Sequence, residues 1–148
     1  MLPVKVENFI LKDQQGGDFE LYKNLDKKIL LVFYPKDKSP VCSLQLADYQ
    51  KNINLFKSAG ILPVGINTAS ITSHKSFCDH KGITFPILSD DDKTISRRFN
   101  ALNIFSGNKR KIVLIDNSGE VKYQKDLFPY KYDSAGKILN ELRSRYII

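Results

Sequence analysis

The sequence contains no tryptophan, one methionine, two histidines and two cysteines among its 148 residues. Two cysteines are too few for the disulfide framework of a small secreted domain, so we expect a reducing compartment, with the cytoplasm as the location. No apolar run approaches the roughly 18 residues that a membrane-spanning helix needs, and the start of the chain shows no basic segment followed by an apolar one. These absences predict a protein that neither spans a membrane nor carries a targeting leader.

The composition is that of one ordinary globular domain, which we expect to extend over residues 1–148. Apolar residues make up 42% of the chain and charged residues 26%, and no repeat or polar linker interrupts it. The net charge of +7 attracts anions without specificity. The densest basic run, at residues 109–111, leads directly into an apolar strand, and no nucleic-acid-binding motif accompanies it. The sequence therefore predicts no nucleic-acid partner.

Apolar runs alternate with helical stripes along the chain. The unbroken run at residues 29–34, ended by Pro35, is typical of a strand buried on both faces at the centre of a sheet. Further strands are expected at residues 61–67, 85–88, 111–115 and 121–124, and helices at 42–56 (ended by Gly60), 70–81, 94–99 and 134–146. This order indicates an α/β protein with a central mixed β-sheet flanked by helices. Residues 4–10 and 19–21 add an N-terminal β-hairpin around a turn at 14–17.

Cys42 is the first candidate for chemistry. It follows a polar loop bounded by Pro35 and Pro40, at the start of the helix that comes after the central strand. Ligands of open α/β folds bind at this edge of the sheet, and the positive end of a helix lowers the pKa of a thiol. The alternative is that Cys42 is a small apolar residue on the buried stripe of the helix. The polar loop before it favours the functional interpretation.

The segment at residues 32–42 resembles the active-site segment of the peroxiredoxins. The family pattern is Pro, three residues, Thr or Ser, two residues and Cys, which Pro35, Ser39 and Cys42 match. The likeness continues through most of the chain, at residues 65–67, 73–77, 85–90, 110–116 and 119. In its length and in the segment at 85–90, the sequence is similar to the bacterioferritin comigratory protein, or PrxQ, group of this AhpC/TSA family.

The resemblance implies a thioredoxin-like fold and a role for each matching residue. Cys42 would be the peroxidatic cysteine, Ser39 would hydrogen-bond the peroxide, Pro35 would shield the pocket, and Arg110 would hold the thiolate and the substrate. Arg110 directly precedes a predicted strand, where its planar fork of donors can face a thiolate and an oxygen together. The alternative for Arg110 is a solvated cation in a basic run.

The second cysteine decides how oxidised Cys42 is recycled. Cys78 lies 36 residues after Cys42, in the next predicted helix, a spacing similar to that of the PrxQ branch with its resolving cysteine there. The other branch, with a cysteine five residues after the first, is excluded because Ala47 occupies that position. Cysteines on separate packed helices rarely approach the roughly 7 Å between Cα atoms that a disulfide needs, so we expect local unfolding. The alternative for Cys78 is a buried structural thiol.

Two positions depart from the family pattern. Gln45 stands where a glutamate commonly orients the arginine, so that carboxylate is missing or comes from elsewhere. Ser39 replaces the commoner threonine; it keeps the hydroxyl but loses the methyl that restricts its rotamer.

Other clusters have simpler explanations. His74 and His80 flank Cys78 but do not complete a four-ligand zinc site, and we expect both at the surface. The acidic residues 90–92 suit the start of the helix that follows them. Phe128, Tyr130 and Tyr132 could form an aromatic binding strip, but packing under the last helix explains them as well. We therefore expect no metal and no cofactor.

The resulting hypothesis is a peroxidase that reduces hydrogen peroxide and organic hydroperoxides through a Cys42–Cys78 disulfide, with thioredoxin or a similar dithiol as reductant. The PrxQ resemblance implies a monomer. One alternative is a one-cysteine enzyme in which an external thiol resolves Cys42. Another is a redox sensor whose oxidised Cys42 signals to a partner. A thioredoxin-type oxidoreductase is disfavoured because Ser39 replaces the first cysteine of Cys-x-x-Cys.

Overall fold

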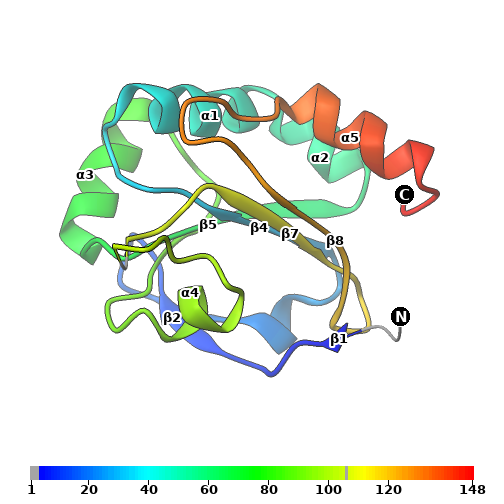
Figure 1. Cartoon of the computed structure of the whole chain (residues 1–148), viewed down its shortest axis with the longest axis horizontal. Helices are drawn as coiled ribbons and strands as arrows, with labels where there is room; N and C mark the ends of the chain where they lie inside the picture. The colour runs from blue at the N-terminus through cyan, green and yellow to red at the C-terminus, as the bar shows by residue number, and fades with distance from the viewer. Residues whose placement is uncertain (1–3, 106) are drawn as a thin grey trace.

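The computed structural model describes residues 4–105 and 107–148, and these residues form one mixed sheet (Figure 1). The strands along the chain are β1 (Val4–Lys5), β2 (Ile10–Lys12), β3 (Asp18–Glu20), β4 (Lys28–Phe33), β5 (Ile61–Asn67), β6 (Ile87–Ser89), β7 (Lys111–Ile115) and β8 (Glu120–Asp126). Their order in the sheet is β1-β8-β7-β4-β5-β6-β2-β3. The predicted α/β class and mixed sheet are confirmed.

The central position of β4 agrees with its apolar sequence. β4 pairs in parallel with β5 and antiparallel with β7, and all but the first of its residues are buried. Successive side chains point to opposite faces of the sheet. Leu30, Val32 and Tyr34 therefore join one hydrophobic cluster, whereas Leu31 and Phe33 join another on the opposite face.

The helices are α1 (Pro40–Lys51), α2 (Ile53–Ser58), α3 (Ile71–Lys81), α4 (Thr94–Arg98) and α5 (Ala135–Ser144), with a 3-10 turn at Leu21–Asn24. Figure 1 shows α1, α2, α3 and α5 on one side of the sheet and α4 with the N-terminal strands on the other. The first group covers the cluster that contains Cys42, Phe77 and Cys78. Both cysteines are thus on the same side of the sheet.

The helix predicted over residues 42–56 is divided in the structure, so that prediction is wrong. Asn52 leaves the helical conformation at φ −105° and ψ 23°, and α2 begins after it. The side-chain amide of Asn52 donates to the Asp48 carbonyl at 2.9 Å. An asparagine side chain competes in this way with the backbone bonds of a helix interior. Gly60, at φ 72°, ends the second piece as predicted.

The two ends of the described chain need smaller corrections. The predicted hairpin forms, but only from β2 and β3, while β1 pairs with β8 near the opposite edge of the sheet. Tyr146, expected on the buried face of the last helix, is 95% exposed. It follows α5 with φ 57°, and the Ile147 amide then donates to the Leu142 carbonyl at 2.9 Å. This turn directs Ile147 to the core instead.

Candidate active site

Cys42 lies in the first turn of α1, where the sequence places it. Ser39 is the N-cap residue and Pro40 begins the helix, a position that suits proline because the first amides of a helix have no partner within it. The first bond of the helix runs from the Ser43 amide to the Ser39 carbonyl at 2.8 Å. The thiol of Cys42 is buried and reduced. Because Cys42 is in the first turn, its thiol lies at the positive end of the helix dipole.

Arg110 is the polar group that meets this thiol. Its Nη2 lies 3.3 Å from Sγ of Cys42 and 3.2 Å from the carbonyl oxygen of Pro129, and its Nη1 donates to Oε1 of Gln45 at 2.5 Å. Arg110 is only 2% exposed. It lies just before β7, at the end of the sheet where α1 begins, so its side chain reaches Cys42. No carboxylate in the described part of the chain pairs with it. The guanidinium is therefore a buried cation whose partners are a thiol and neutral oxygens.

Gln45 takes the place that the glutamate of the family pattern was expected to fill. Its oxygen accepts from Arg110, while its Nε2 donates to the Tyr49 hydroxyl at 3.1 Å. The Tyr49 hydroxyl in turn donates to the Asp133 carbonyl at 2.7 Å. Burial raises the pKa of Tyr49, so the hydroxyl keeps its proton and continues to donate. An amide at position 45 thus orients Arg110 without adding a negative charge.

Ser39 and Pro35 lie on the loop that leads into α1. The Ser39 hydroxyl is half-buried and donates to the Lys36 carbonyl at 3.2 Å. Pro35 is exposed, and its carbonyl accepts from Nδ2 of Asn67 at 2.9 Å. Asn67 also holds the Tyr34 carbonyl at 2.7 Å. The end of β5 therefore fixes the start of this loop.

Cys78 occupies a very different environment near the end of α3. It is 3% exposed and belongs to the same hydrophobic cluster as Cys42. Burial, together with the charges of Asp37 and Asp79, raises the pKa of Cys78 to about 12. Both cysteines are free thiols in the structure. In this conformation Cys78 is thus a protonated, weakly nucleophilic thiol.

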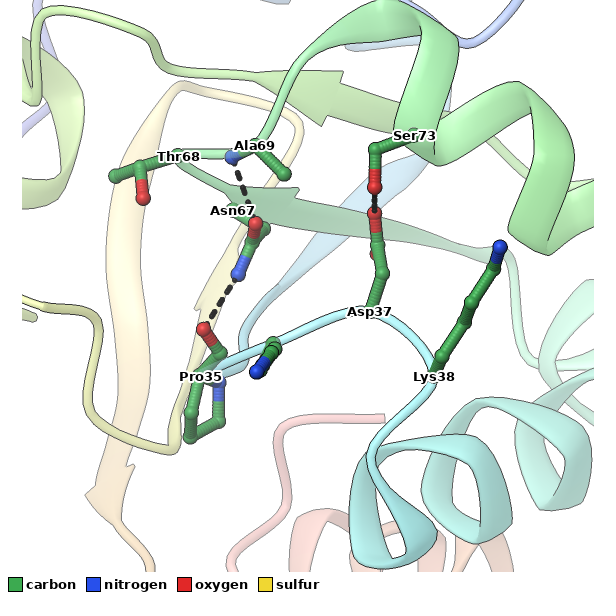
Figure 2. Close-up of a pocket in the computed structure, with 8 residues that line it drawn as sticks. Pro35, Asp37, Lys38, Asn67, Thr68, Ala69 and Ser73 are labelled. Carbon is green, nitrogen blue, oxygen red and sulfur yellow. Dashed lines mark hydrogen bonds between the residues drawn. The ribbon is translucent and has the colours of Figure 1, made fainter.

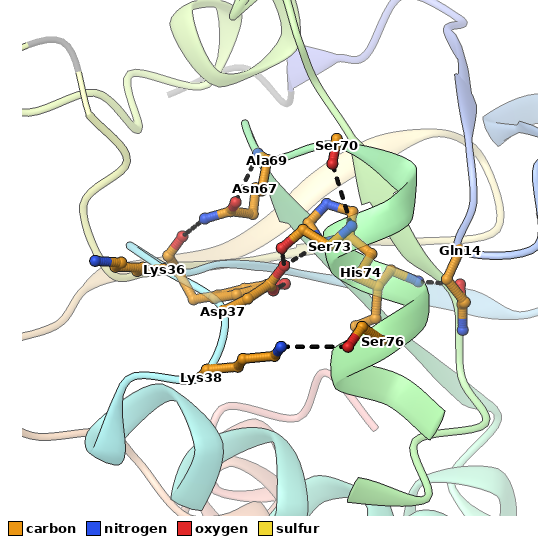
Figure 3. Close-up of polar contacts among 12 residues, drawn as sticks. Gln14, Lys36, Asp37, Lys38, Asn67, Ala69, Ser70, Ser73, His74 and Ser76 are labelled. Carbon is orange, nitrogen blue, oxygen red and sulfur yellow. Dashed lines mark hydrogen bonds and ion pairs between the residues drawn. The ribbon is translucent and has the colours of Figure 1, made fainter. Parts of the chain in front are cut away.

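Asp37 connects the loop before Cys42 to the helix that carries Cys78. Its carboxylate accepts from the Tyr34 hydroxyl at 2.5 Å and the Ser73 hydroxyl at 2.6 Å, and it lies 2.7 Å from Nδ1 of His74. Figure 3 shows Asp37 facing Ser73 and His74 of α3, with Lys38 of the same loop reaching Ser76. We call these four side chains, Tyr34, Asp37, Ser73 and His74, the Asp37 cluster.

A cavity of about 430 Å³ lies beside this cluster (Figure 2). It is lined by residues 35–38 of the loop and by residues 67–69 and 73 before and within α3. Cys42 does not line it. The cavity is thus on the side of the loop that faces α3, rather than at the thiol.

Sequence reasoning missed the Asp37 cluster and placed His74 wrongly. His74 was expected at the surface but is fully buried, whereas His80 is exposed. One signal was available: His74 precedes Cys78 by four residues and so shares its helix face. The partner, Asp37, comes from a loop that no periodicity describes.

The other expected roles have mixed outcomes. Asp90 accepts from the Ser96 amide at 2.6 Å and Asp92 from the Thr94 amide at 3.0 Å, so the acidic run caps α4 as predicted. Of the two explanations left open for the aromatic loop, packing under the last helix does not hold for two residues, because Phe128 and Tyr130 are 75% and 85% exposed. They flank Pro129, whose carbonyl oxygen accepts from Arg110, and so they lie near the Cys42 site.

Comparisons with known proteins show the family to which this fold belongs. The model of the AhpC/TSA family matches residues 4–124. The chain is 31% identical over 140 residues to "Peroxiredoxin Q, chloroplastic" of Sedum lineare, covering 91% of this chain and 75% of that protein. It is 32% identical over 138 residues to "Putative peroxiredoxin bcp" of Buchnera aphidicola, covering 88% and 86%. Across such relatives, the chain spans from 54% to 86% of their length.

The solved structure of PrxQ from Xylella fastidiosa superposes with a TM-score of 0.88 at 23% identity, covering 99% of this chain and 97% of that one. The chain therefore belongs to the AhpC/TSA family. Within it, the relatives carry the names of the peroxiredoxin Q and bacterioferritin comigratory protein group. The thioredoxin-like fold and the predicted class, a thiol-dependent peroxidase, are confirmed. In the described residues, no helix has the length and apolar character to cross a membrane.

Proposed function

We propose that Cys42 attacks a hydroperoxide and that Cys78 resolves the product as an intramolecular disulfide. The observation that carries this proposal is the contact of Arg110 with Cys42. A buried guanidinium without a carboxylate is costly unless another negative charge faces it. Nη2 of Arg110 lies 3.3 Å from Sγ of Cys42. The cation is therefore placed to stabilise the negative charge that this sulfur and the peroxide carry during the reaction.

In the first step, the Cys42 thiolate bonds to the terminal oxygen of ROOH while the O–O bond breaks. Cys42 is oxidised to a sulfenic acid, and the leaving alkoxide takes a proton to become ROH. Negative charge spreads over both oxygens as the bond breaks. Arg110, the unpaired amides of the first turn of α1 and the Ser39 hydroxyl are the donors available to stabilise it. In this proposal Pro35, at the start of the loop, shields the site of Cys42.

In the second step, the Cys78 sulfur attacks the Cys42 sulfenic acid, and a disulfide and one water molecule form. Cys78 must first leave its buried position and lose its proton, because its raised pKa makes it a poor nucleophile where it lies. We therefore propose that the Cys42 turn, α3 or both unfold locally. A dithiol reductant then exchanges with the disulfide and is itself oxidised, which restores both thiols.

Several finer properties belong to the same proposal. Residues 1–148 act as one monomeric domain, thioredoxin is the reductant, and the protein works in the cytoplasm, where its two free thiols are kept reduced. Substrates include organic hydroperoxides as well as hydrogen peroxide. The exposed rings of Phe128 and Tyr130, on either side of the Pro129 carbonyl that Arg110 contacts, support this range because they offer apolar surface to an alkyl group.

The test is the intact mass of the reduced protein after one equivalent of hydrogen peroxide, compared with Cys42→Ser and Cys78→Ser. We expect the native protein to lose two hydrogens and neither variant to do so. Cys78→Ser should instead gain oxygen at Cys42. An oxygen adduct on the native protein would favour the one-cysteine or sensor alternative, and an unchanged mass would contradict the peroxidase activity.

A further inference from the structure

The Asp37 cluster is the main polar contact between the two segments that carry the cysteines. Asp37 lies in the loop five residues before Cys42, and His74 lies on α3 four residues before Cys78. The Asp37 carboxylate faces Nδ1 of His74 at 2.7 Å and the Ser73 hydroxyl at 2.6 Å. Asp37 is 6% exposed and His74 is fully buried. Hydrogen bonds to a buried carboxylate are among the stronger ones in proteins.

The charges in the Asp37 cluster favour the contact between the loop and α3. Burial raises the pKa of Asp37, but the hydrogen bonds from His74, Ser73 and Tyr34 outweigh it and hold the pKa below its usual value. The carboxylate is therefore ionised and depends on these donors. The cluster fastens the loop to α3 as long as they remain in place.

The loop before Cys42 contains a strained backbone position next to the contact of Asp37 with α3. Lys38, directly after Asp37, has φ 63°, in the left-handed region that a residue with a Cβ rarely adopts. The cavity beside the cluster leaves open space next to residues 35–38. A loop released from α3 can therefore relax without displacing packed side chains.

We propose that Asp37 and His74 form a clamp that sets the rate of disulfide formation by holding the loop of Cys42 against the helix of Cys78. This inference rests on the proposed role of Cys78 as the resolving cysteine. With the clamp closed, Cys42 faces Arg110 and reacts with peroxide, while Cys78 stays buried. With the clamp open, both segments unfold locally and the thiols can meet. Asp37 and His74 are positioning residues, since neither touches the reacting atoms.

His74→Phe is the sharpest variant because, in the described residues, the ring makes its only polar contact at Nδ1. Nε2 of His74 is buried with no hydrogen-bond partner in the described residues. A phenyl ring thus keeps the shape and removes the contact with Asp37. His74→Asn is the conservative variant, since its Nδ2 can donate to Asp37 in place of Nδ1. His80→Phe is the matched control, because His80 is an exposed histidine on the same helix.

The rates of sulfenic acid formation and of disulfide formation distinguish a positioning role of Asp37 and His74 from a general loss of structure. After rapid mixing with peroxide and acid quenching, mass spectrometry follows the sulfenic acid and the disulfide. For His74→Phe we expect disulfide formation to be about tenfold faster, the effect of losing one buried charge-assisted hydrogen bond. The peroxide step should slow by less than about threefold, because the closed state still predominates. His74→Asn should return toward the native rates, and His80→Phe should match them.

A second readout uses the reduced protein, so it does not depend on Cys78 as the resolving residue. Amide hydrogen exchange at residues 36–43 and 71–78 should be about tenfold faster in His74→Phe and unchanged in His80→Phe. Fewer turnovers should end in sulfinic acid in His74→Phe, because the sulfenic acid is resolved sooner. If His74→Phe does not fold, Asp37→Asn is used, which keeps the shape and removes the charge.

The outcomes distinguish the clamp from the proposed function. Equal exchange and equal disulfide rates in His74→Phe and the native protein would overturn the clamp alone. Absence of the disulfide in the native protein would instead overturn the role of Cys78. A slower disulfide step in His74→Phe would also overturn the clamp, because it would mean that the contact promotes resolution.

Discussion

The two cysteines lie on the same side of one sheet, yet their surroundings have opposite electrostatic character. Cys42 faces the cation of Arg110 and the positive end of α1. Cys78 is buried at the other end of a helix, α3, and the charges of Asp37 and Asp79 act on it. Cations and amide donors favour a thiolate, whereas burial and carboxylates favour a thiol. This contrast supports the proposed function, in which Cys42 attacks peroxide and Cys78 does not.

This difference explains how two thiols in one hydrophobic cluster avoid exchanging roles. If Cys78 were also a thiolate in the folded protein, peroxide could oxidise it and leave no thiol for resolution. In the proposed cycle, the low reactivity of Cys78 in the closed state therefore preserves it for resolution. The price is a conformational change, which the Asp37 cluster is placed to control.

The largest expected effect comes from removing the cation at Cys42. Arg110→Met should slow oxidation of Cys42 by peroxide by about 100-fold to 1000-fold, the range seen when one preorganised donor is lost from a site where charge develops. Because the chain has no tryptophan, the rate is best measured by acid quenching and mass spectrometry. Lys109→Met is the control, since Lys109 pairs with Asp126 at the surface. A loss of less than tenfold would mean that Arg110 is not the main donor.

The inertness of Cys78 can be measured directly in Cys42→Ser. At pH 8 we expect iodoacetamide to label Cys78 at least about 100 times more slowly in the folded protein than in urea, because only the thiolate reacts. The raised pKa and the burial of the thiol act in the same direction. Similar labelling rates in both conditions would remove the contrast between the two cysteines.

The same pKa predicts how stability depends on pH. Between about 9, the ordinary value, and about 12, the folded protein keeps a proton on Cys78 that the unfolded chain releases. The unfolded state then binds fewer protons, so this contribution to stability is complete below pH 9 and is lost as pH rises. The native protein should lose up to about 1.4 kcal/mol more per pH unit than Cys78→Ala. Urea denaturation from pH 8 to 10.5 measures both slopes, and equal slopes would contradict the prediction.

A smaller effect is expected at Gln45, which orients the cation. Gln45→Leu leaves Nη1 of Arg110 without its acceptor and should slow the peroxide step about fivefold. Gln45→Glu keeps an acceptor but places a carboxylate beside Arg110 that competes with the Cys42 thiolate, so we expect a change within about threefold. Steady-state turnover with hydrogen peroxide compares the two variants. An equal loss in both would show that the amide nitrogen bonded to Tyr49 matters more than the oxygen.

The smallest effect is expected at Ser39. Ser39→Ala removes one hydroxyl donor and should slow the peroxide step about threefold, while Ser39→Thr should keep the native rate. The serine is half-buried, and in the described residues its hydroxyl bonds only to the Lys36 carbonyl, so removing the hydroxyl leaves no buried side chain unpaired. A loss as large as that of Arg110→Met would place Ser39 among the main donors.

Local patterns in the sequence were sufficient for most of the fold. The apolar run at residues 29–34 predicted the central strand, because only a strand buried on both faces tolerates such a run. The position of Cys42 at a helix start followed from the prolines and the polar loop before it. The division of helix 42–56 could not be predicted in this way, since a stripe of apolar residues does not report that the Asn52 side chain binds the Asp48 carbonyl.

Only the tertiary structure decided which distant residues contact one another around the two cysteines. Arg110 and Gln45 are 65 residues apart in the chain, and Asp37 and His74 are 37 apart. No periodicity relates such positions, because their contact depends on how the sheet aligns its loops and how α1 and α3 pack on it. The sequence alone determined that the two cysteines lie on two different helices. The fold determined that Cys42 contacts a buried cation, whereas Cys78 lies in an apolar cluster where burial and the charges of Asp37 and Asp79 raise its pKa. This difference in surroundings is the physical reason for the opposite roles that we propose for two chemically identical side chains.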